Sequence, residues 1–439
     1  MTRWRDLSRL TGASGAWPAL LLAGVVLVAA WLVKSPCMDA QPVSAGWVGF
    51  DQRPIVSTCY NDIVLLYRSH QLDSWTFPYA SVWEVDGTPR FMEYPVITGV
   101  FMWLAASLAR LVGGGVASVA LYFTVTCLLL GGLWLGAVRA YRSVVGPGAT
   151  LLLATSPLLV VHAFTNWDLL PMGLVVAALV AFRSGRPVLT GVFIGLGTAA
   201  KLFSILVLGP LLVLAVRRTI PLRQWAAIAG SALATWLAAN LPVLVLYPAA
   251  WGEFFRMNSE RPPEWNSIYF IASRVAGRTF PVVNLVSLVL FAGLCLAILW
   301  VALRARAVPQ VSELMVLVLA AFLLSNKVWS PQYSLWLLPF VFLAVDTLRP
   351  LLAWQATEIT VWLTLTPLLG PVAGAGDATW FLVSAVVRDA CLVFICLAVL
   401  RRMRRRGSPV DDPFLPGSPG GTPPGARWRS PGATGGVPS

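Results

Sequence analysis

Long apolar segments separated by short polar turns recur along most of the chain. A helix that crosses a bilayer needs about 20 mostly apolar residues, and fewer when two short helices share one crossing. The pattern therefore predicts a series of membrane-spanning helices. The candidate spans are 17–33, 116–138, 148–164, 168–182, 188–200, 202–216, 225–246, 281–303, 310–325, 331–348, 351–370 and 380–400.

The first apolar segment, 17–33, follows three arginines, as the apolar core of a signal peptide does. No small-residue cleavage pattern follows it before Lys34, and many apolar segments lie downstream. We expect an uncleaved first helix.

Basic residues gather in short clusters between pairs of candidate spans, and such clusters favour the cytoplasmic side of a membrane. If the N-terminus is cytoplasmic, an even number of crossings separates successive clusters. The clusters are Arg139 with Arg142, Arg183 with Arg186, Arg217 with Arg218 and Arg223, Arg304 with Arg306, Arg349, and the arginines of 401–406.

One further apolar segment, 95–112, breaks this parity if it crosses the membrane. It follows Tyr94, carries Arg110 near its end and runs into three consecutive glycines. We expect it to lie along the outer interface as an amphipathic or re-entrant helix. The prediction is an all-α polytopic membrane protein with about 12 transmembrane helices, an extracytoplasmic polar face and both termini cytoplasmic.

Composition agrees with this class and excludes others. Of the 439 residues, 57% are hydrophobic and 12% are charged, whereas a soluble domain has about 25% charged residues. The net charge of +13 comes from scattered topology clusters rather than from one basic surface, so we expect no nucleic-acid partner. We expect the plasma membrane as the location and membrane lipids as partners.

The predicted organisation has one membrane domain with two flanking segments. We expect a cytoplasmic N-terminus over 1–16 and the membrane domain over 17–406, whose first extracytoplasmic loop, 34–115, contains interfacial helices. The Pro/Gly-rich segment 407–439 is expected to be a disordered cytoplasmic tail.

The cysteines and the two histidines form no metal-binding pattern, so we expect no metal and no cofactor. Cys37 and Cys59 lie in the same polar loop. They form a disulfide if that loop faces an oxidising compartment, and two unpaired thiols are the alternative.

The three lysines, Lys34, Lys201 and Lys327, all fall on the predicted outer side. Lys201 and Lys327 interrupt apolar segments, where a lysine at the interface is less costly than one at mid-bilayer. Either lysine alone is explained by snorkelling at a helix end. Together with arginines of the second outer loop, they indicate an anion site, and lipid phosphate is the anion at hand.

Acidic residues on the same side carry a second kind of chemistry. Asp62 begins an amphipathic helix, Glu93 precedes Tyr94-Pro95, and Asp168 precedes a helix. Capping of a helix N-terminus is an alternative role for each carboxylate, and Asn61 can also be the cap before Asp62. In 326–333, capping explains Ser330 and a helix start explains Pro331.

At these residues the chain resembles the integral-membrane glycosyltransferases of the GT-C superfamily, and most of all the actinobacterial family 87, whose members use polyprenyl-phosphate-mannose. The resemblance rests on Tyr60-Asn61-Asp62, Phe77-Pro78-Tyr79, Glu93-Tyr94-Pro95, Ala200-Lys201-Leu202-Phe203 and the segment from Asn326 to Tyr333. It covers most of the membrane part but not the tail. The motif has a single aspartate in place of an Asp-x-Asp pair.

The resemblance implies a hexosyltransferase that moves a sugar, mannose in this family, from a polyprenyl-phosphate donor to an envelope glycolipid or glycan. Asp62 matches the catalytic base of such enzymes. We expect Lys201 and Lys327 to neutralise the donor phosphate as it leaves, with inversion at the sugar. The expected substrate-binding residues are Asn61, Glu93, Tyr94, Asn166, Asp168, Gln332 and Tyr333.

Two other functions fit the same class of chain. A secondary transporter places coupling charges near the bilayer midplane at a repeat interface, whereas this sequence has no visible repeat and few charges within spans. A noncatalytic scaffold of the envelope machinery would tolerate replacement of Asp62 and both lysines.

Overall fold

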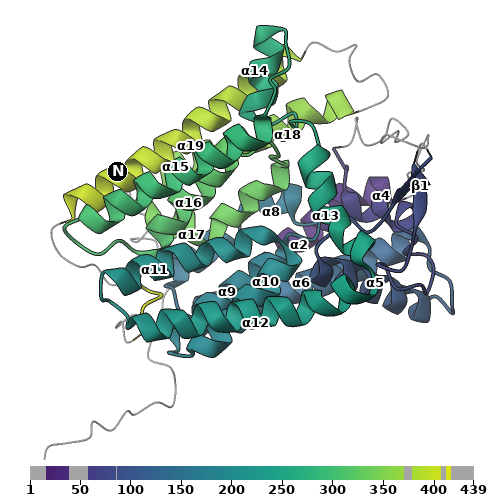
Figure 1. Cartoon of the computed structure of the whole chain (residues 1–439), viewed down its shortest axis with the longest axis horizontal. Coiled ribbons are helices and arrows are strands. Elements are labelled where there is room, and N and C mark those ends of the chain that lie inside the picture. Colours follow the sequence, from purple (N-terminus) through teal and green to yellow (C-terminus); the bar gives the residue numbers. More distant parts are fainter. Residues whose placement is uncertain (1–15, 39–57, 86, 370–377, 407–411, 417–439) are drawn as a thin grey trace, which may run out of the picture.

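The computed structural model describes residues 16–38, 58–85, 87–369, 378–406 and 412–416, and these form a bundle of helices (Figure 1). Nearly every apolar segment of the sequence is helical. The α-helices are α2 (Trp17–Lys34), α4 (Asp62–Ser69), α5 (Val96–Val112), α6 (Val119–Arg142), α7 (Pro147–Ala154), α8 (Pro157–His162), α9 (Leu169–Arg183), α10 (Pro187–Ala200), α11 (Leu208–Val216), α12 (Leu222–Leu246), α13 (Pro248–Glu260), α14 (Ile268–Ala276), α15 (Val283–Arg304), α16 (Val311–Ser325), α17 (Leu338–Ala344), α18 (Leu348–Leu365) and α19 (Thr379–Arg405).

Five segments of the described chain are long and apolar enough to cross a membrane: Trp17–Cys37, Val119–Arg142, Leu222–Leu246, Val283–Arg304 and Thr379–Arg405. Shorter apolar helices accompany them. In α15 only Ala302 is buried, although the helix is almost wholly apolar. A surface of that kind is stable against lipid, not water. The chain is a multi-pass membrane protein.

Several predicted spans consist of two shorter pieces. The segment expected at 148–164 breaks between α7 and α8, because Pro157 lacks the N–H that a continuous helix needs and disfavours helical backbone before it. The segments expected at 202–216 and 331–348 begin as 3-10 helices, η3 (Leu202–Val207) before α11 and η4 (Pro331–Leu337) before α17. A further 3-10 turn, η2 (Ser35–Cys37), extends α2, and η5 (Thr366–Leu369) follows α18.

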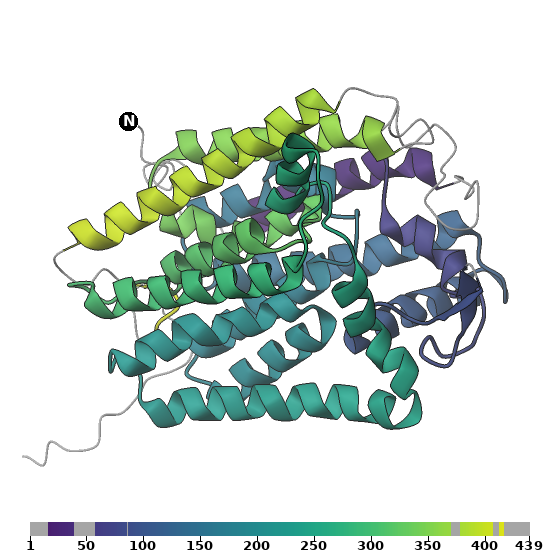
Figure 2. The ribbon, with the colours of Figure 1, turned by 45° about the horizontal axis from the view of Figure 1, so that its top comes forward.

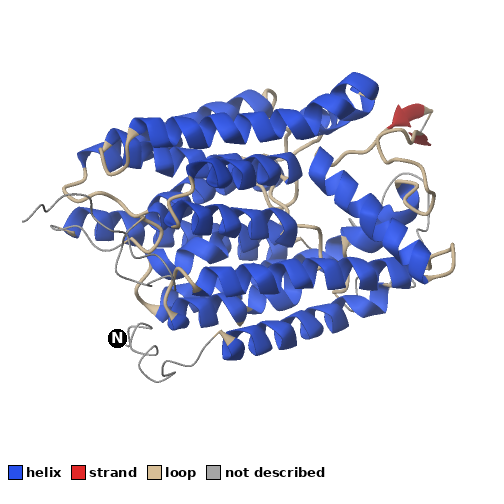
Figure 3. Ribbon diagram, turned by 90° about the horizontal axis from the view of Figure 1, so that it is seen from below, coloured by secondary structure: helices blue, strands red, loops and turns tan. Residues whose placement is uncertain are grey.

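The all-α class is confirmed, and beside the helices lies one small antiparallel hairpin of β1 (Trp83–Val85) and β2 (Thr88–Arg90), which the sequence analysis did not predict. Figure 3 shows it as the strand pair at the edge of the helical bundle. Gly87 has φ +72°, which suits a tight hairpin turn. The Asp86-Gly87 pair in the sequence is a signal typical of such turns.

The two ends of the bundle differ in character. At one end, which we call the cap end, lie α4, the hairpin and α5 (Figure 1, right). The turn between α11 and α12 and the C-terminal end of α19 lie at the opposite end (Figure 1, left; also Figure 2). Arg217 and Arg218 belong to that turn, and the last turn of α19 carries Arg402, Arg404 and Arg405. These arginines therefore lie together at the end opposite the cap end.

Helix α10, which ends just before Lys201, packs closely on α12. A Cβ atom at Gly191 or Gly195 would overlap backbone atoms of α12, so only glycine permits this approach. Lys201 is the first residue after this closely packed helix.

Part of the segment expected to be disordered is packed in the structure. Phe414 is fully buried and lies against Tyr141, and the Asp412 carboxylate accepts the N–H of Val311 at 2.7 Å. Two apolar residues next to a buried carboxylate are enough to dock this short stretch. The rest of the predicted tail and the predicted N-terminal segment up to residue 15 lie outside the described residues.

Candidate active site

Asp62 is the first residue of α4, and its neighbour Asn61 forms the cap. The Asn61 amide accepts the Val64 N–H at 2.8 Å and donates to the Cys59 carbonyl at 3.0 Å. Capping was one of the two roles considered for this pair, and it is confirmed for Asn61. The Asp62 carboxylate is therefore left for other contacts.

Three contacts fix Asp62 in place. Its backbone N–H donates to the Thr165 carbonyl at 2.8 Å. The Tyr60 hydroxyl donates to Oδ1 at 2.9 Å, and the Asn166 amide donates to Oδ2 at 2.7 Å. A carboxylate has about four lone-pair positions, so two remain available to take a proton.

Burial and hydrogen bonding shift the pKa of Asp62 in opposite directions. Burial raises the pKa of the carboxyl above its usual value, the hydrogen bonds from Asn166 and Tyr60 lower it, and the nearby Glu93 raises it again. A general base works best when its pKa approaches the ambient pH, and a raised pKa moves a carboxylate toward that condition.

A Tyr60→Phe variant tests this balance. Loss of the hydroxyl removes a donor that stabilises the carboxylate, so the pKa of Asp62 rises further and the base is protonated at higher pH. We expect the acidic limb of the pH–activity profile to move up by about one pH unit, because a hydrogen bond to a charged group contributes roughly 1.5–3 kcal/mol. Tyr67→Phe, seven residues further along the chain in α4, removes a hydroxyl that donates to the Ala117 carbonyl and is the matched control. An acidic limb that does not move in Tyr60→Phe would contradict the assignment.

The second group of charges lies where α10 ends. The Lys201 ammonium donates to Asp168 Oδ1 at 2.7 Å and lies over the ring of Tyr333, 4.6 Å from its centre. The Trp336 indole N–H also donates to Asp168 Oδ1 at 2.7 Å. Asp168 precedes α9 but makes no side-chain cap, so the capping alternative is wrong for it. Its carboxylate is instead a buried counter-charge for Lys201.

Lys327 points to a different neighbourhood from Lys201. Its ammonium donates to the carbonyls of Ser259 at 3.0 Å and Arg261 at 2.6 Å, at the end of α13. With Arg261 and Asn284 it lines an open cavity between α13 and the start of α15. Arg261 forms an ion pair with Glu264 at 2.5 Å. Arg261 therefore contacts both the cavity and the Glu264 carboxylate.

The segment 326–333 is tied to the loop before α14. The Glu264 N–H donates to the Lys327 carbonyl at 2.9 Å, and the Ser330 hydroxyl donates to Glu264 Oε2 at 3.2 Å. Ser330 therefore makes no side-chain cap, although Pro331 begins η4 as predicted. Burial raises the pKa of Glu264, and Arg261 lowers it.

A buried arginine, Arg388, contacts both the segment 326–333 and the loop before α14. The Arg388 guanidinium lies 3.5 Å from the centre of the Trp329 ring and donates to the Asn266 carbonyl at 2.9 Å. It also donates to Asp389 at 2.8 Å. Arg388 lies within α19, and the Asp389 carboxylate balances its charge locally.

The other predicted substrate-binding residues fall into two groups, one beside Asp62 and one beside Lys201. The Tyr94 hydroxyl is 3.0 Å from the Asn166 amide nitrogen, and Glu93 is 3.9 Å from the imidazole of His70. Gln332 is buried beside Tyr333 in η4, and Tyr333 stacks on Trp336 with ring centres 4.1 Å apart. Asn61 is fully buried and engaged locally, so its side chain does not face this group.

An aromatic pocket adjoins Tyr94. It lies between α5, α12 and α13 and is lined by Tyr79, Tyr94, Trp236, Trp251, Phe254 and Phe255, among others. The lining is mostly aromatic, and the cavity volume is about 20 Å³.

The sequence reasoning missed Tyr60 and Trp336 as partners of the two carboxylates, and it counted Arg261 only among the arginines of its loop. Tyr60 stands in the quoted Tyr60-Asn61-Asp62 string, so proximity was its signal. No sequence signal pointed to Trp336, because its contact is with Asp168, 168 positions away in the chain. Among the described residues, no group of three or more His, Cys, Asp or Glu side chains is placed to hold a metal ion.

The Asp62 carboxylate with its two donors and the Lys201–Asp168 ion pair belong to one multi-pass membrane protein. The family model of glycosyltransferase family 87 matches residues 91–331. The chain belongs to glycosyltransferase family 87 and is a membrane glycosyltransferase.

No curated protein matches the chain. Among solved structures, the chain is similar to ArnT from Cupriavidus metallidurans bound to undecaprenyl phosphate, with 16% identity, a TM-score of 0.44, and 89% of this chain and 78% of that chain covered. No conclusion about this chain rests on that likeness.

Proposed function

We propose that the protein transfers a mannose residue from a polyprenyl-phosphate donor to an envelope glycolipid or glycan, with inversion at the sugar, and that Asp62 is the general base. The observation that carries the proposal is the Asp62 carboxylate. Tyr60 and Asn166 hold it in place, and two of its lone-pair positions remain available to accept a proton. Membership of family 87 supports the class of reaction.

The reaction needs one proton transfer and one exchange of bonds. The acceptor hydroxyl oxygen forms a bond to the anomeric carbon while its proton passes to Asp62. The bond from that carbon to the donor phosphate oxygen breaks, and polyprenyl phosphate leaves with the electron pair. Attack from the face opposite the leaving group inverts the configuration.

The leaving phosphate gains charge, which cations stabilise. We assign this role to Lys201 and Lys327, and we add Arg261, which lines the same cavity as Lys327. Each of these three cations has protein partners that hold it in place. Their positions therefore do not depend on a bound ligand.

The remaining substrate contacts come from side chains around the two carboxylates. We assign sugar and acceptor binding to Glu93, Tyr94, Asn166, Asp168, Gln332 and Tyr333. Asn61 leaves this set, because its amide is engaged in capping α4.

We place the site on the extracytoplasmic face of the plasma membrane, with both termini cytoplasmic and about 12 crossings by the positive-inside rule. The Cys37–Cys59 disulfide supports this, because disulfides persist in oxidising compartments. We also propose that α5 stays within the first loop rather than crossing. Near its C-terminal end, Arg110 donates to the Leu72 carbonyl and lies 4.4 Å over the Trp75 ring, while Tyr94 at its start reaches Asn166.

Transport is the principal rival function, and one experiment separates the two. Proteoliposomes with the purified protein receive a polyprenyl-phosphate donor labelled in the sugar and an envelope lipid extract. The proposed function predicts a new labelled glycolipid and released polyprenyl phosphate. Exchange of the label across the bilayer with the donor chemically unchanged would support a transporter instead.

A further inference from the structure

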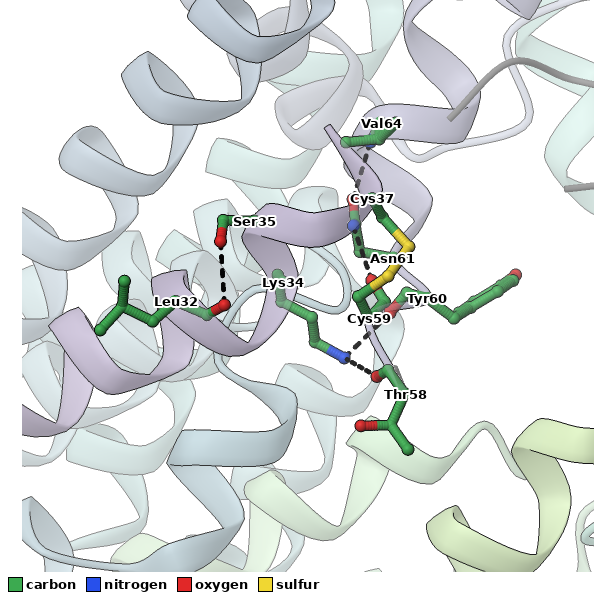
Figure 4. The surroundings of a disulfide bond; sticks show 9 residues. All are labelled: Leu32, Lys34, Ser35, Cys37, Thr58, Cys59, Tyr60, Asn61 and Val64. Atoms are coloured by element: carbon green, nitrogen blue, oxygen red, sulfur yellow. Dashed lines mark hydrogen bonds between the residues drawn. A yellow bond between two sulfur atoms is a disulfide. The ribbon is translucent and has the colours of Figure 1, made fainter. Parts of the chain in front are cut away.

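The chain that leads into Asp62 is attached to the end of α2 at two points (Figure 4). Cys37, in η2, forms a disulfide with Cys59. The Lys34 ammonium donates to the Tyr60 carbonyl at 2.9 Å and to the Thr58 carbonyl at 3.5 Å. Covalent and polar attachments therefore alternate along residues 58–60, immediately before the capping residue and the base.

The α2 end of this attachment is itself firmly held. Ala23, Leu27, Ala30 and Lys34 form one buried stripe along the helix, and Lys34 is fully buried despite its charge. The Lys34 ammonium also lies 4.6 Å from the centre of the Trp362 ring in α18. Burying a lysine is costly unless its donors are used, and here carbonyls and an aromatic face use them.

The attachment reaches Asp62 by two short routes. Through the backbone, Cys59 and Tyr60 are followed directly by Asn61, whose amide donates back to the Cys59 carbonyl. Through side chains, the Trp362 ring touches Lys34 and Tyr60, and Tyr60 donates its hydroxyl to the base. A shift of residues 58–60 would therefore move both the base and one of its two donors.

We propose that the Cys37–Cys59 disulfide and the Lys34 ammonium together form a clamp, here named the α2 clamp, that positions Asp62, and that sugar transfer depends on the disulfide being oxidised. The inference rests on the proposed role of Asp62. Lys34 and the two cysteines are positioning residues in this account, because none of them touches the reacting atoms. Displacement of a reactive group by about 1 Å can cost about 100-fold in rate, so a loosened clamp acts on turnover more than on binding.

The first test uses the folded wild-type protein. A phosphine reductant transfers two electrons to the disulfide, the sulfurs take up two protons to give two thiols, and the phosphine becomes its oxide with oxygen from water. We expect kcat to fall roughly 10-fold or more after reduction, with the donor KM changed less than about two-fold. Alkylation and mass measurement count the thiols released. The C37S/C59S variant should have the same low kcat and no response to the reductant.

The control for cysteine chemistry is the C295S/C391S variant, which alters two free cysteines in α15 and α19 and should respond to reduction as wild type does. The K34M variant tests the second half of the clamp. It keeps the disulfide and the length of the side chain but loses the ammonium. We expect its kcat to fall at least as much as that of the reduced wild type.

A readout that needs no activity separates failure of the clamp from failure of the proposed function. Amide hydrogen exchange follows the Asp62 and Val64 N–H groups, which donate to Thr165 and Asn61. Reduction is expected to speed their exchange while the amides of α9 stay protected. If fully reduced wild type transfers sugar at the oxidised rate and these amides exchange unchanged, the clamp is wrong. A wild type that transfers no sugar at all would instead count against the proposed function.

Discussion

Replacement of Asp62 by asparagine is expected to abolish sugar transfer while the protein remains folded. Asparagine keeps the size of the side chain and can still accept from Tyr60 or Asn166, but it cannot take the acceptor proton. General base catalysis contributes about 100- to 10,000-fold, so we expect a loss of that order in kcat. The measurement is the initial rate of glycolipid formation by purified protein at saturating donor.

Asp73→Asn is the matched control for this variant. Asp73 is exposed in the same loop, and the chemical change is the same. It should transfer sugar at close to the wild-type rate. Equal rates for Asp62→Asn and wild type would overturn the base assignment and leave the family membership untouched.

Replacement of Lys201 by methionine is expected to damage both stability and activity. It leaves the Asp168 carboxylate buried without its cation, and breaking a buried pair in this way costs about 3–5 kcal/mol. It also removes a cation that the proposed reaction uses to stabilise the leaving phosphate. We expect a lower thermal midpoint and a loss of roughly 100-fold or more in kcat/KM.

The double variant Lys201→Met with Asp168→Asn separates these two effects. A neutral amide at position 168 no longer needs the cation and can still accept from Trp336, so the thermal midpoint should recover. Transfer should stay low, because the leaving phosphate still lacks Lys201. Recovery of both quantities in the double variant would mean that Lys201 serves only as the counter-charge of Asp168.

Much of the helical framework follows from the hydrophobic pattern, because lipid requires apolar helices wherever the chain crosses. Asn61 before Asp62 and Pro331 at the start of η4 were also readable, since capping and N-terminal proline are local effects. The break before Pro157 and the β1–β2 hairpin each have a local signal in the sequence, the proline itself and the Asp86-Gly87 pair. Neither signal belongs to the hydrophobic pattern that predicts spans. The packed residues 412–416 were hidden, because their burial depends on α16 and Tyr141.

The sequence does not show which residues of the candidate site contact one another. Asp168 and Lys201 were both recognised, yet nothing in the sequence joins two residues on different helices into one ion pair. For the same reason the sequence does not show that Lys201 contacts Asp168 while Lys327 contacts backbone carbonyls at the end of α13. The Cys37–Cys59 pair was an open alternative that depended on topology, and the structure contains the disulfide.

The most direct test of the central claim is the configuration of the product bond. Purified protein receives a polyprenyl-phosphate-mannose donor of known anomeric configuration and an envelope glycolipid acceptor, and the product is analysed by NMR. A single displacement with Asp62 as base predicts a new glycosidic bond of the configuration opposite to that of the donor, absent with Asp62→Asn. A product that retains the donor configuration, or one formed equally well by Asp62→Asn, would contradict it.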